Sequence, residues 1–142
     1  MDESLTSATM RQAEEGKHHR PTGEYRDIVE RTFSFSLEIV RLCQRLDGKP
    51  GVARILAMQL LKAGTSVGAN VEEAQAGQSR ADFVSKYAIA LKEARETRYW
   101  LRLISEAELI DENAVGALIR ESGELSRILG SITSRARRRD TT

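Results

Sequence analysis

The chain of 142 residues has the length of one domain, and its composition limits what that domain contains. Apolar residues make up 40% of it and aromatic residues only 5%, so a core must consist mainly of Leu, Ile, Val and Ala. The formal net charge of +1 gives no overall field for nucleic acid or a membrane, so such binding would require locally clustered charge.

Cysteine content and hydropathy indicate a reducing compartment. Cys43 is the single cysteine, which excludes an internal disulfide. The N-terminal residues lack the apolar run of a secretory signal, and no segment approaches the roughly 20 apolar residues that span a bilayer. We therefore expect a cytoplasmic protein without a membrane partner.

Residues 1–23 are polar and aperiodic, which predicts a disordered arm ahead of the folded domain. His18 and His19 lie in this arm, and two adjacent histidines on a mobile segment make a poor metal site. We expect the folded domain over residues 24–137 and a short tail over residues 138–142.

The segment 24–46 has the periodicity of a helix. Apolar residues recur at steps near 3.5 and 7: Ile28, Phe35, Ile39, Leu42 and Leu46. Flanking apolar residues, Val29, Phe33, Val40 and Cys43, widen the stripe, which is typical of a helix buried on two sides. Gly48 and Pro50 are suited to end this helix and start the next.

The segment 50–75 predicts a second helix with an unusually small middle. One face carries Val52, Ile55, Gln59, Ala63, Val67, Asn70 and Ala74. Gly64 and Gly68 each cost a helix interior about 1 kcal/mol relative to alanine. We therefore expect a neighbouring helix to approach this backbone closely.

Two further helices complete the domain. Ser79 and Asp82 have the spacing of a capping box, and the helix 80–108 carries the stripe Phe83, Tyr87, Ala90, Ala94, Thr97, Leu101 and Ile104. Asp111 can cap the last helix, whose seam is Val115, Leu118, Ser122, Leu125, Leu129 and Ile132. Four long helices with short loops predict an all-α, antiparallel up-down-up-down four-helix bundle.

The second and third segments resemble a known family. The stretch 66–74, SVGANVEEA, followed by Ser79 and Asp82-Phe83, is similar to the four-helix-bundle proteins encoded by intervening sequences of bacterial 23S rRNA genes. The runs 90–97 and 99–101 resemble the third helix of the same family. The resemblance spans about residues 31–135 and extends to the accessory variability determinant proteins of diversity-generating retroelements.

This resemblance implies properties that periodicity does not show. Members of the family form homopentamers and have no recognised enzymatic activity. The retroelement proteins bind nucleic acid and a reverse transcriptase through basic surfaces. The present chain departs from those strongly basic members in its near-zero net charge.

The sequence offers no catalytic, metal or cofactor site. A di-metal carboxylate site would need Glu-x-x-His on two helices, and no histidine follows His19. Carboxylates alone are present, at Glu72, Glu73, Glu93 and Glu96. The missing histidines also exclude the base of a nucleophilic triad. We expect neither an enzyme nor a small-molecule substrate.

Four polar residues near the predicted core form a first candidate cluster: Asn70, Glu73, Lys92 and Thr97. One interpretation is a ligand site. The other is a structural polar network between the second and third helices, because buried polar groups require partners.

Apolar residues away from the core stripes predict a subunit interface: Phe33, Val40, Tyr99, Trp100 and Leu103. Exposed aromatic patches commonly mark protein contacts. The alternative for Trp100 is packing within the margin of its own bundle.

Arginines form the candidate nucleic-acid surface. In the last helix Gly116, Arg120, Gly123, Arg127, Gly130 and Ser134 recur on one stripe, roughly 150° from the core seam, and Arg135, Arg137, Arg138 and Arg139 follow. Glycines between the arginines would let a phosphate backbone or a helix approach closely. A solvated face is the alternative. Arg95, Arg98 and Arg102 form a second row, for which ordinary pairing with Glu96, Glu106 and Glu108 is the simpler interpretation.

The leading hypothesis is a non-enzymatic oligomeric scaffold that engages RNA, DNA or a nucleic-acid enzyme such as a reverse transcriptase. The alternative is a protein-interaction module that binds no nucleic acid.

Overall fold

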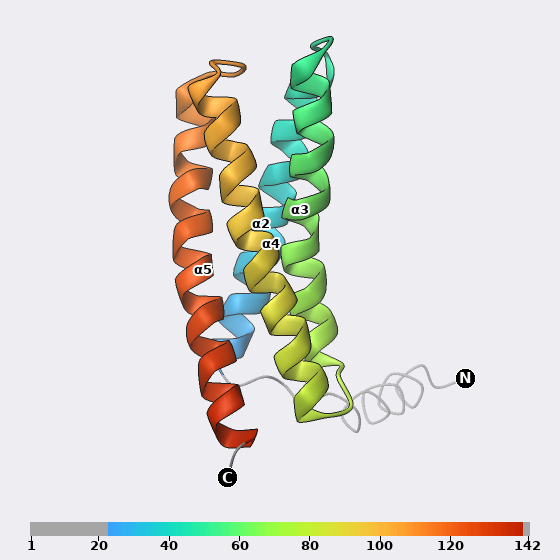
Figure 1. The fold of residues 1–142 in the computed structure, drawn as a ribbon, viewed down its shortest axis with the longest axis vertical. Coiled ribbons are helices and arrows are strands. Elements are labelled where there is room, and N and C mark those ends of the chain that lie inside the picture. The colour runs from blue at the N-terminus through green and yellow to red at the C-terminus, as the bar shows by residue number, and fades with distance from the viewer. Residues whose placement is uncertain (1–22, 141–142) are drawn as a thin grey trace, which may run out of the picture.

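A computed structural model describes residues 23–140, which form four helices and no strand. The helices are α2 (Gly23–Asp47), α3 (Val52–Gln75), α4 (Arg80–Glu106) and α5 (Glu112–Asp140). They run antiparallel along one axis, which confirms the all-α four-helix bundle (Figure 1). The last helix extends past the end expected at residue 137, whereas nearly all of the expected arm, including His18 and His19, lies outside the described residues.

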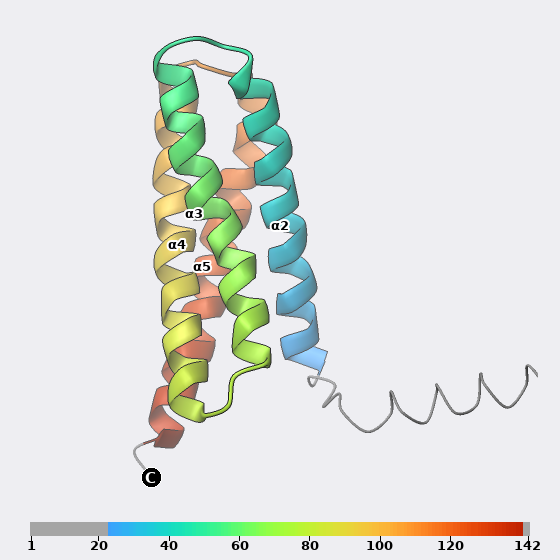
Figure 2. The ribbon, with the colours of Figure 1, turned by 90° about the vertical axis from the view of Figure 1, so that its right-hand side faces the viewer.

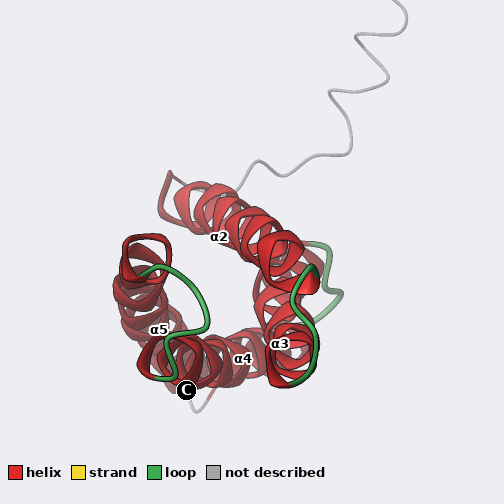
Figure 3. Cartoon of the chain, turned by 90° about the horizontal axis from the view of Figure 1, so that it is seen from above, coloured by secondary structure: helices red, strands yellow, loops and turns green. Residues whose placement is uncertain are grey.

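Helices adjacent in sequence are adjacent in space. Viewed along the bundle, α2, α3, α4 and α5 follow one another in a ring (Figure 3). The α2–α3 and α4–α5 loops lie at one end, and the α3–α4 loop lies at the other (Figure 2). Far fewer residues join α2 to α5 than join the other neighbouring pairs. The first and last helices therefore close the ring through a sparse contact.

The core consists of the apolar stripes that the sequence predicts for three of the helices. The stripe residues of α2 are buried, as are those of α4 and α5 apart from the half-buried Phe83 and Leu118. Buried hydroxyls bond to carbonyls of their own helix, as Thr32 does to Ile28 at 2.8 Å and Thr133 to Leu129 at 2.7 Å. No buried side-chain nitrogen or oxygen atom of the described residues lacks a partner.

The predicted core face of α3 is wrong in its first half. Val52 and Ile55 are 64% and 62% exposed, and Gln59 is also exposed. The buried face carries smaller residues: Ala53, Ala57, Leu60, Ala63, Gly64, Val67, Gly68, Val71 and Ala74. Mostly small residues face inward because α2 and α4 both approach this helix, and Val52 and Ile55 are left outside.

Gly64 and Gly68 are the points of closest approach between α2 and α3. A Cβ atom at Gly64 would lie 2.5 Å from Cγ2 of Ile39, and one at Gly68 would lie 2.8 Å from Oγ of Ser36. The close approach allows Ser36 of α2 to make two hydrogen bonds to the backbone of α3. Its hydroxyl donates to the Gly64 carbonyl at 2.9 Å and accepts from the Gly68 amide at 3.3 Å. The close approach expected from the small residues is thus present.

We predict that alanine substitution separates this packing role from helix propensity. Gly64→Ala should lower the free energy of unfolding by about 1–3 kcal/mol, because overpacking against buried Ile39 outweighs the propensity gain. Gly123→Ala is the matched control: its Cβ would lie 3.8 Å from the nearest atom, Nε of Arg98, so it should stabilise by up to about 1 kcal/mol. Urea unfolding followed by circular dichroism measures both, and equal effects would contradict the close approach.

Candidate functional site

Five exposed arginines of α4 and α5 lie on either side of one helix–helix contact. A Cβ at Gly123 of α5 would lie 3.8 Å from Nε of Arg98, and one at Gly130 would lie 3.9 Å from Leu91 of α4. The glycine stripe therefore faces the flank of α4 and brings together two rows that are separate in sequence. We call this surface the arginine face; it consists of Arg95, Arg98, Arg102, Arg120 and Arg127.

The guanidinium groups of the arginine face have no bonded partner in the part of the chain that the structure describes. Within residues 23–140, none of its five guanidinium groups makes an ion pair or a hydrogen bond with another residue. The expected pairing of the α4 row with Glu96, Glu106 and Glu108 is wrong. Glu96 instead accepts a hydrogen bond from the indole N–H of Trp100 at 3.3 Å. The positive charge of this surface is thus available to an external anion.

Carboxylates of α5 are directed away from the arginine face by Arg31 of α2. Arg31 donates from Nη2 to Glu121 Oε1 at 2.5 Å and from Nε to Oε2 at 3.1 Å, and it also bonds to Glu124. Hydrogen bonding to Glu121 is the main cause that raises the pKa of Arg31. Glu124 follows Arg120 by four positions and precedes Arg127 by three, so it could otherwise pair with either on the helix surface.

Glu93 also leaves the arginine face uncompensated. Burial and then the neighbouring Glu96 raise the pKa of Glu93, while Lys92 and Lys62 of α3 oppose the shift. The two lysines, and none of the five arginines, are the cations that act on this carboxyl.

The C-terminal arginines form a separate group at the end of α5. Arg135 donates to the Ser131 carbonyl at 3.4 Å, and Arg137, Arg138 and Arg139 occupy the last helical turn. All four are exposed, and Arg135, Arg138 and Arg139 take part in further local interactions. Positive charges at the C-terminal end of a helix also stabilise it by interacting with the helix macrodipole. These arginines can therefore stabilise α5 without binding a ligand.

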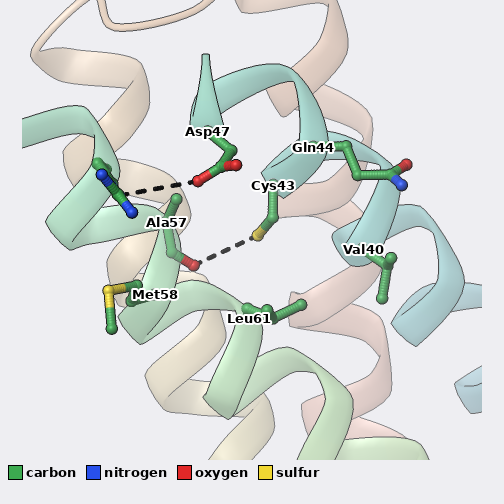
Figure 4. Close-up of a pocket in the computed structure, with 8 residues that line it drawn as sticks. Val40, Cys43, Gln44, Asp47, Ala57, Met58 and Leu61 are labelled. Carbon is green, nitrogen blue, oxygen red and sulfur yellow. Dashed lines mark hydrogen bonds and ion pairs between the residues drawn. The ribbon is translucent and has the colours of Figure 1, made fainter. Parts of the chain in front are cut away.

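An apolar groove runs along the outer side of the α2–α3 contact. Its two hollows, of about 270 and 340 Å³, share Val40 and are lined by residues of these two helices. Figure 4 shows the smaller hollow, which Cys43, Met58 and Leu61 line. Four of its apolar side chains are exposed: Phe33 at 59%, Leu37 at 38%, Met58 at 66% and Leu61 at 39%. We call this surface the α2–α3 groove. The pairing of Asp47 with Arg54 at 4.0 Å lies at one end of it.

Cys43 lies at the floor of this groove, and its side chain is buried. Its thiol donates to the Ala57 carbonyl at 3.4 Å, and burial raises the pKa of the Cys43 thiol to about 11 (Figure 4). A thiol with a raised pKa carries little thiolate at neutral pH. Cys43 therefore serves the packing of α2 on α3.

The five residues predicted for a subunit interface divide between two regions. Phe33 and Val40 line the α2–α3 groove. Tyr99 and Leu103 are 53% and 37% exposed on α4, on a different pair of helices. Trp100 is half-buried against the core, as the alternative for this residue proposed.

Of the four residues named for the predicted polar network between α3 and α4, Glu73 bonds across the two helices, whereas Asn70, Lys92 and Thr97 do not. Asn70 donates to the Ser66 carbonyl of its own helix at 2.8 Å, and Thr97 donates to that of Glu93 at 2.7 Å. Lys92 is exposed. The two helices are instead joined by Lys86–Glu73 at 3.1 Å and by Gln75–Tyr87 at 2.8 Å. Glu73 thus pairs with Lys86 in place of Lys92, a choice of partner that periodicity cannot resolve.

Within the described chain, no group of three or more histidine, cysteine or acidic side chains is placed to hold a metal ion. None of the helices in the same range combines the length and apolar character that crossing a bilayer requires.

Comparison with known proteins agrees with this architecture. The family model for the 23S rRNA-intervening sequence protein matches residues 24–131. The chain belongs to this family. A crystal structure of a protein of unknown function from the S23 ribosomal protein family of Bacteroides thetaiotaomicron is similar, with a TM-score of 0.71 and 38% identity. The match covers 78% of this chain and 98% of that one, and no curated protein matches.

The range of the family match separates the two groups of arginines. It includes the whole arginine face and the α2–α3 groove but stops before Arg135. The surface built on α4 and α5 is therefore part of the family domain, whereas Arg135, Arg137, Arg138 and Arg139 follow it.

We predict that Arg31 stabilises the sparse α2–α5 contact. Arg31→Ala should lower the free energy of unfolding by about 1 kcal/mol, since partial exposure screens the pairing and the two carboxylates then repel each other. Arg41→Ala is the control, because Arg41 pairs with Glu38 at 2.7 Å on the exposed surface of one helix. Arg41→Ala should lower the free energy of unfolding by less than about 0.5 kcal/mol. Urea unfolding at low and high salt measures both; equal losses would show that Arg31 contributes no more than a surface pair.

Proposed function

We propose that this protein is a non-enzymatic scaffold that binds nucleic acid through the arginine face and assembles through the α2–α3 groove. The observation that carries the proposal is the set of five exposed arginines with no partner among the described residues. Guanidinium groups match phosphate oxygens in geometry and remain charged at any physiological pH. A polyanion such as nucleic acid can pair with several of these cations at once, so it is the ligand that this surface should bind most tightly.

Glycines between the arginines support contact with a phosphate backbone. Gly116, Gly123 and Gly130 have no side chains of their own, and the nearest side chains to them are those of Arg120, Arg98 and Leu91, respectively. The guanidinium groups of Arg120 and Arg98 therefore lie close to the α5 backbone, where a phosphate backbone can contact both. Catalysis at this surface would require a general base or a nucleophile. The five side chains of the arginine face are permanently charged guanidinium groups, which serve as neither. The scaffold function follows from this chemistry.

Assembly is supported by the apolar surface of the α2–α3 groove. Phe33, Leu37, Met58 and Leu61 expose side chains along one continuous face, which is typical of a protein contact. A second copy of the chain is the occupant proposed here, and the number of five subunits comes from the family resemblance. Several copies of the arginine face in one particle would add their weak contacts through avidity.

The alternative function is a protein-interaction module. In this alternative, the glycine stripe of α5 contacts a helix of a partner protein. The partner could be a nucleic-acid enzyme such as a reverse transcriptase. The half-buried position of Gly123 and Gly130 beside Arg98 and Leu91 favours this alternative, because mixed apolar and charged surroundings suit an amphipathic helix.

We predict that charge reversal on α5 abolishes nucleic-acid binding. Arg120→Glu combined with Arg127→Glu should remove it while leaving helicity and particle mass unchanged, because both side chains are exposed. For the unmodified protein, log K against log salt should have a slope of about −0.9 per duplex phosphate contacted and about −0.7 for single strands. Fluorescence anisotropy over a salt series measures this.

Two variants at Gly123 refine the same experiment. Gly123→Leu should weaken binding because its side chain reaches Arg98 and blocks close approach, whereas Gly123→Ala should keep binding. If the unmodified protein binds no nucleic acid, or if binding survives both charge reversals, the result would contradict the scaffold function and favour the protein-interaction module.

We predict that the α2–α3 groove is required for assembly. Phe33→Ser combined with Leu61→Ser should reduce the particle to a monomer, because it removes apolar area from the groove without disturbing buried residues. Ile89→Ser is the control, since Ile89 is 38% exposed but lies on α4. Light scattering at tens of micromolar measures the mass. An unmodified protein that is monomeric there, or a control that dissociates equally, would contradict the assignment.

A further inference from the structure

Tyr99 is an exposed aromatic residue beside the arginine face. Its side chain is 53% exposed on α4, and its ring makes an edge-to-face contact with Trp100 at 5.2 Å between centroids and 70° between planes. A tyrosine that only filled a bundle margin would bury most of its ring. One face of the ring is therefore open to a ligand.

The ring of Tyr99 is held in place by its contact with Trp100. Trp100 packs against the hydrophobic core and donates its indole N–H to Glu96 at 3.3 Å, so its position is fixed from two sides. Edge-to-face contact with a fixed ring restricts the motion of the tyrosine. A ring that is already ordered loses little conformational entropy when a ligand stacks on it.

Unpaired arginines flank this ring along the helix. Arg95 precedes Tyr99 by four positions and Arg102 follows it by three, and these are the two spacings that bring side chains next to each other on a helix surface. Both guanidinium groups lack a partner among the described residues. The helix therefore presents a cation, an aromatic ring and a second cation over about 10 Å.

We propose that Tyr99 is a base-stacking platform, which makes the arginine face selective for single-stranded nucleic acid. The inference rests on the function proposed above and adds the class of ligand. Proteins bind single strands by combining a cationic track for the backbone with aromatic rings on which bases stack. Bases of a duplex are already stacked on each other, so the tyrosine would add nothing to duplex binding.

The alternative role for Tyr99 is a contact between subunits, as its sequence pattern also allowed. That role predicts a change in particle mass on substitution, whereas stacking predicts a change in ligand preference. The charge around the ring favours stacking, because a subunit contact centred on Tyr99 would also have to accommodate the unpaired Arg95 and Arg102.

The experiment compares two probes on the full chain. One is a labelled oligouridine of about 16 nucleotides, the upper site size of a single-strand-binding module, and the other is an RNA duplex of the same length. Tyr99→Ala should weaken oligouridine binding about 5-fold or more, as expected for the loss of one stacked base, and leave duplex binding unchanged. Tyr99→Phe should restore oligouridine binding, because the ring and not the hydroxyl is required.

Leu103→Ala is the matched control, since Leu103 is an exposed apolar residue one turn from Tyr99 on the same helix. It should leave both affinities unchanged. Tyr99→Ala that binds both probes as the unmodified protein does would overturn the stacking role and leave the proposed function intact. Equal losses on both probes, or a changed mass in light scattering, would also overturn it. Failure of the unmodified protein to bind either probe would instead remove the proposed function itself.

Discussion

The close approach of α2 and α3 at Gly64 and Gly68 determines how the rest of the bundle is arranged. With no Cβ on either glycine, Ile39 and Ser36 contact the backbone of α3 directly, and Ser36 joins the two helices through two hydrogen bonds. The buried face of α3 therefore consists mainly of alanine and glycine, with Leu60, Val67 and Val71 between them. Larger apolar side chains are displaced outward, and Met58 and Leu61 come to line an exposed groove beside Phe33.

On its opposite side, α2 meets α5 through a sparse contact that includes ion pairs. Few residues join these two helices, and Arg31 compensates by bonding to Glu121 and Glu124. The same interaction separates charge on α5, because its carboxylates are directed toward α2 while Arg120 and Arg127 remain unpaired beside α4. A structural contact on one side of the helix thus determines the electrostatic character of the other side.

The two exposed surfaces lie on different pairs of helices, and this separation is what makes a scaffold function possible. The α2–α3 groove is apolar and belongs to the first half of the chain, whereas the arginine face is cationic and belongs to the second half. In the proposed function, the groove would contact another copy of the chain and the arginine face would bind the nucleic acid. The near-neutral net charge of the whole chain conceals this local positive surface, because averaging over the sequence mixes it with carboxylates paired elsewhere.

The sequence by itself determined the number, order and approximate bounds of the helices, because apolar periodicity and capping residues act over a few neighbouring positions. It also identified the buried stripes of α2, α4 and α5 and the need for close approach at Gly64 and Gly68. The tertiary structure alone decided which face of α3 is buried, because that depends on which neighbour approaches it. It also decided that Asn70 and Thr97 bond within their own helices, and that Arg98 lies over Gly123. Such contacts join residues whose separation in sequence carries no information about their distance, so only the packing of the helices can bring the two rows of arginines into one surface.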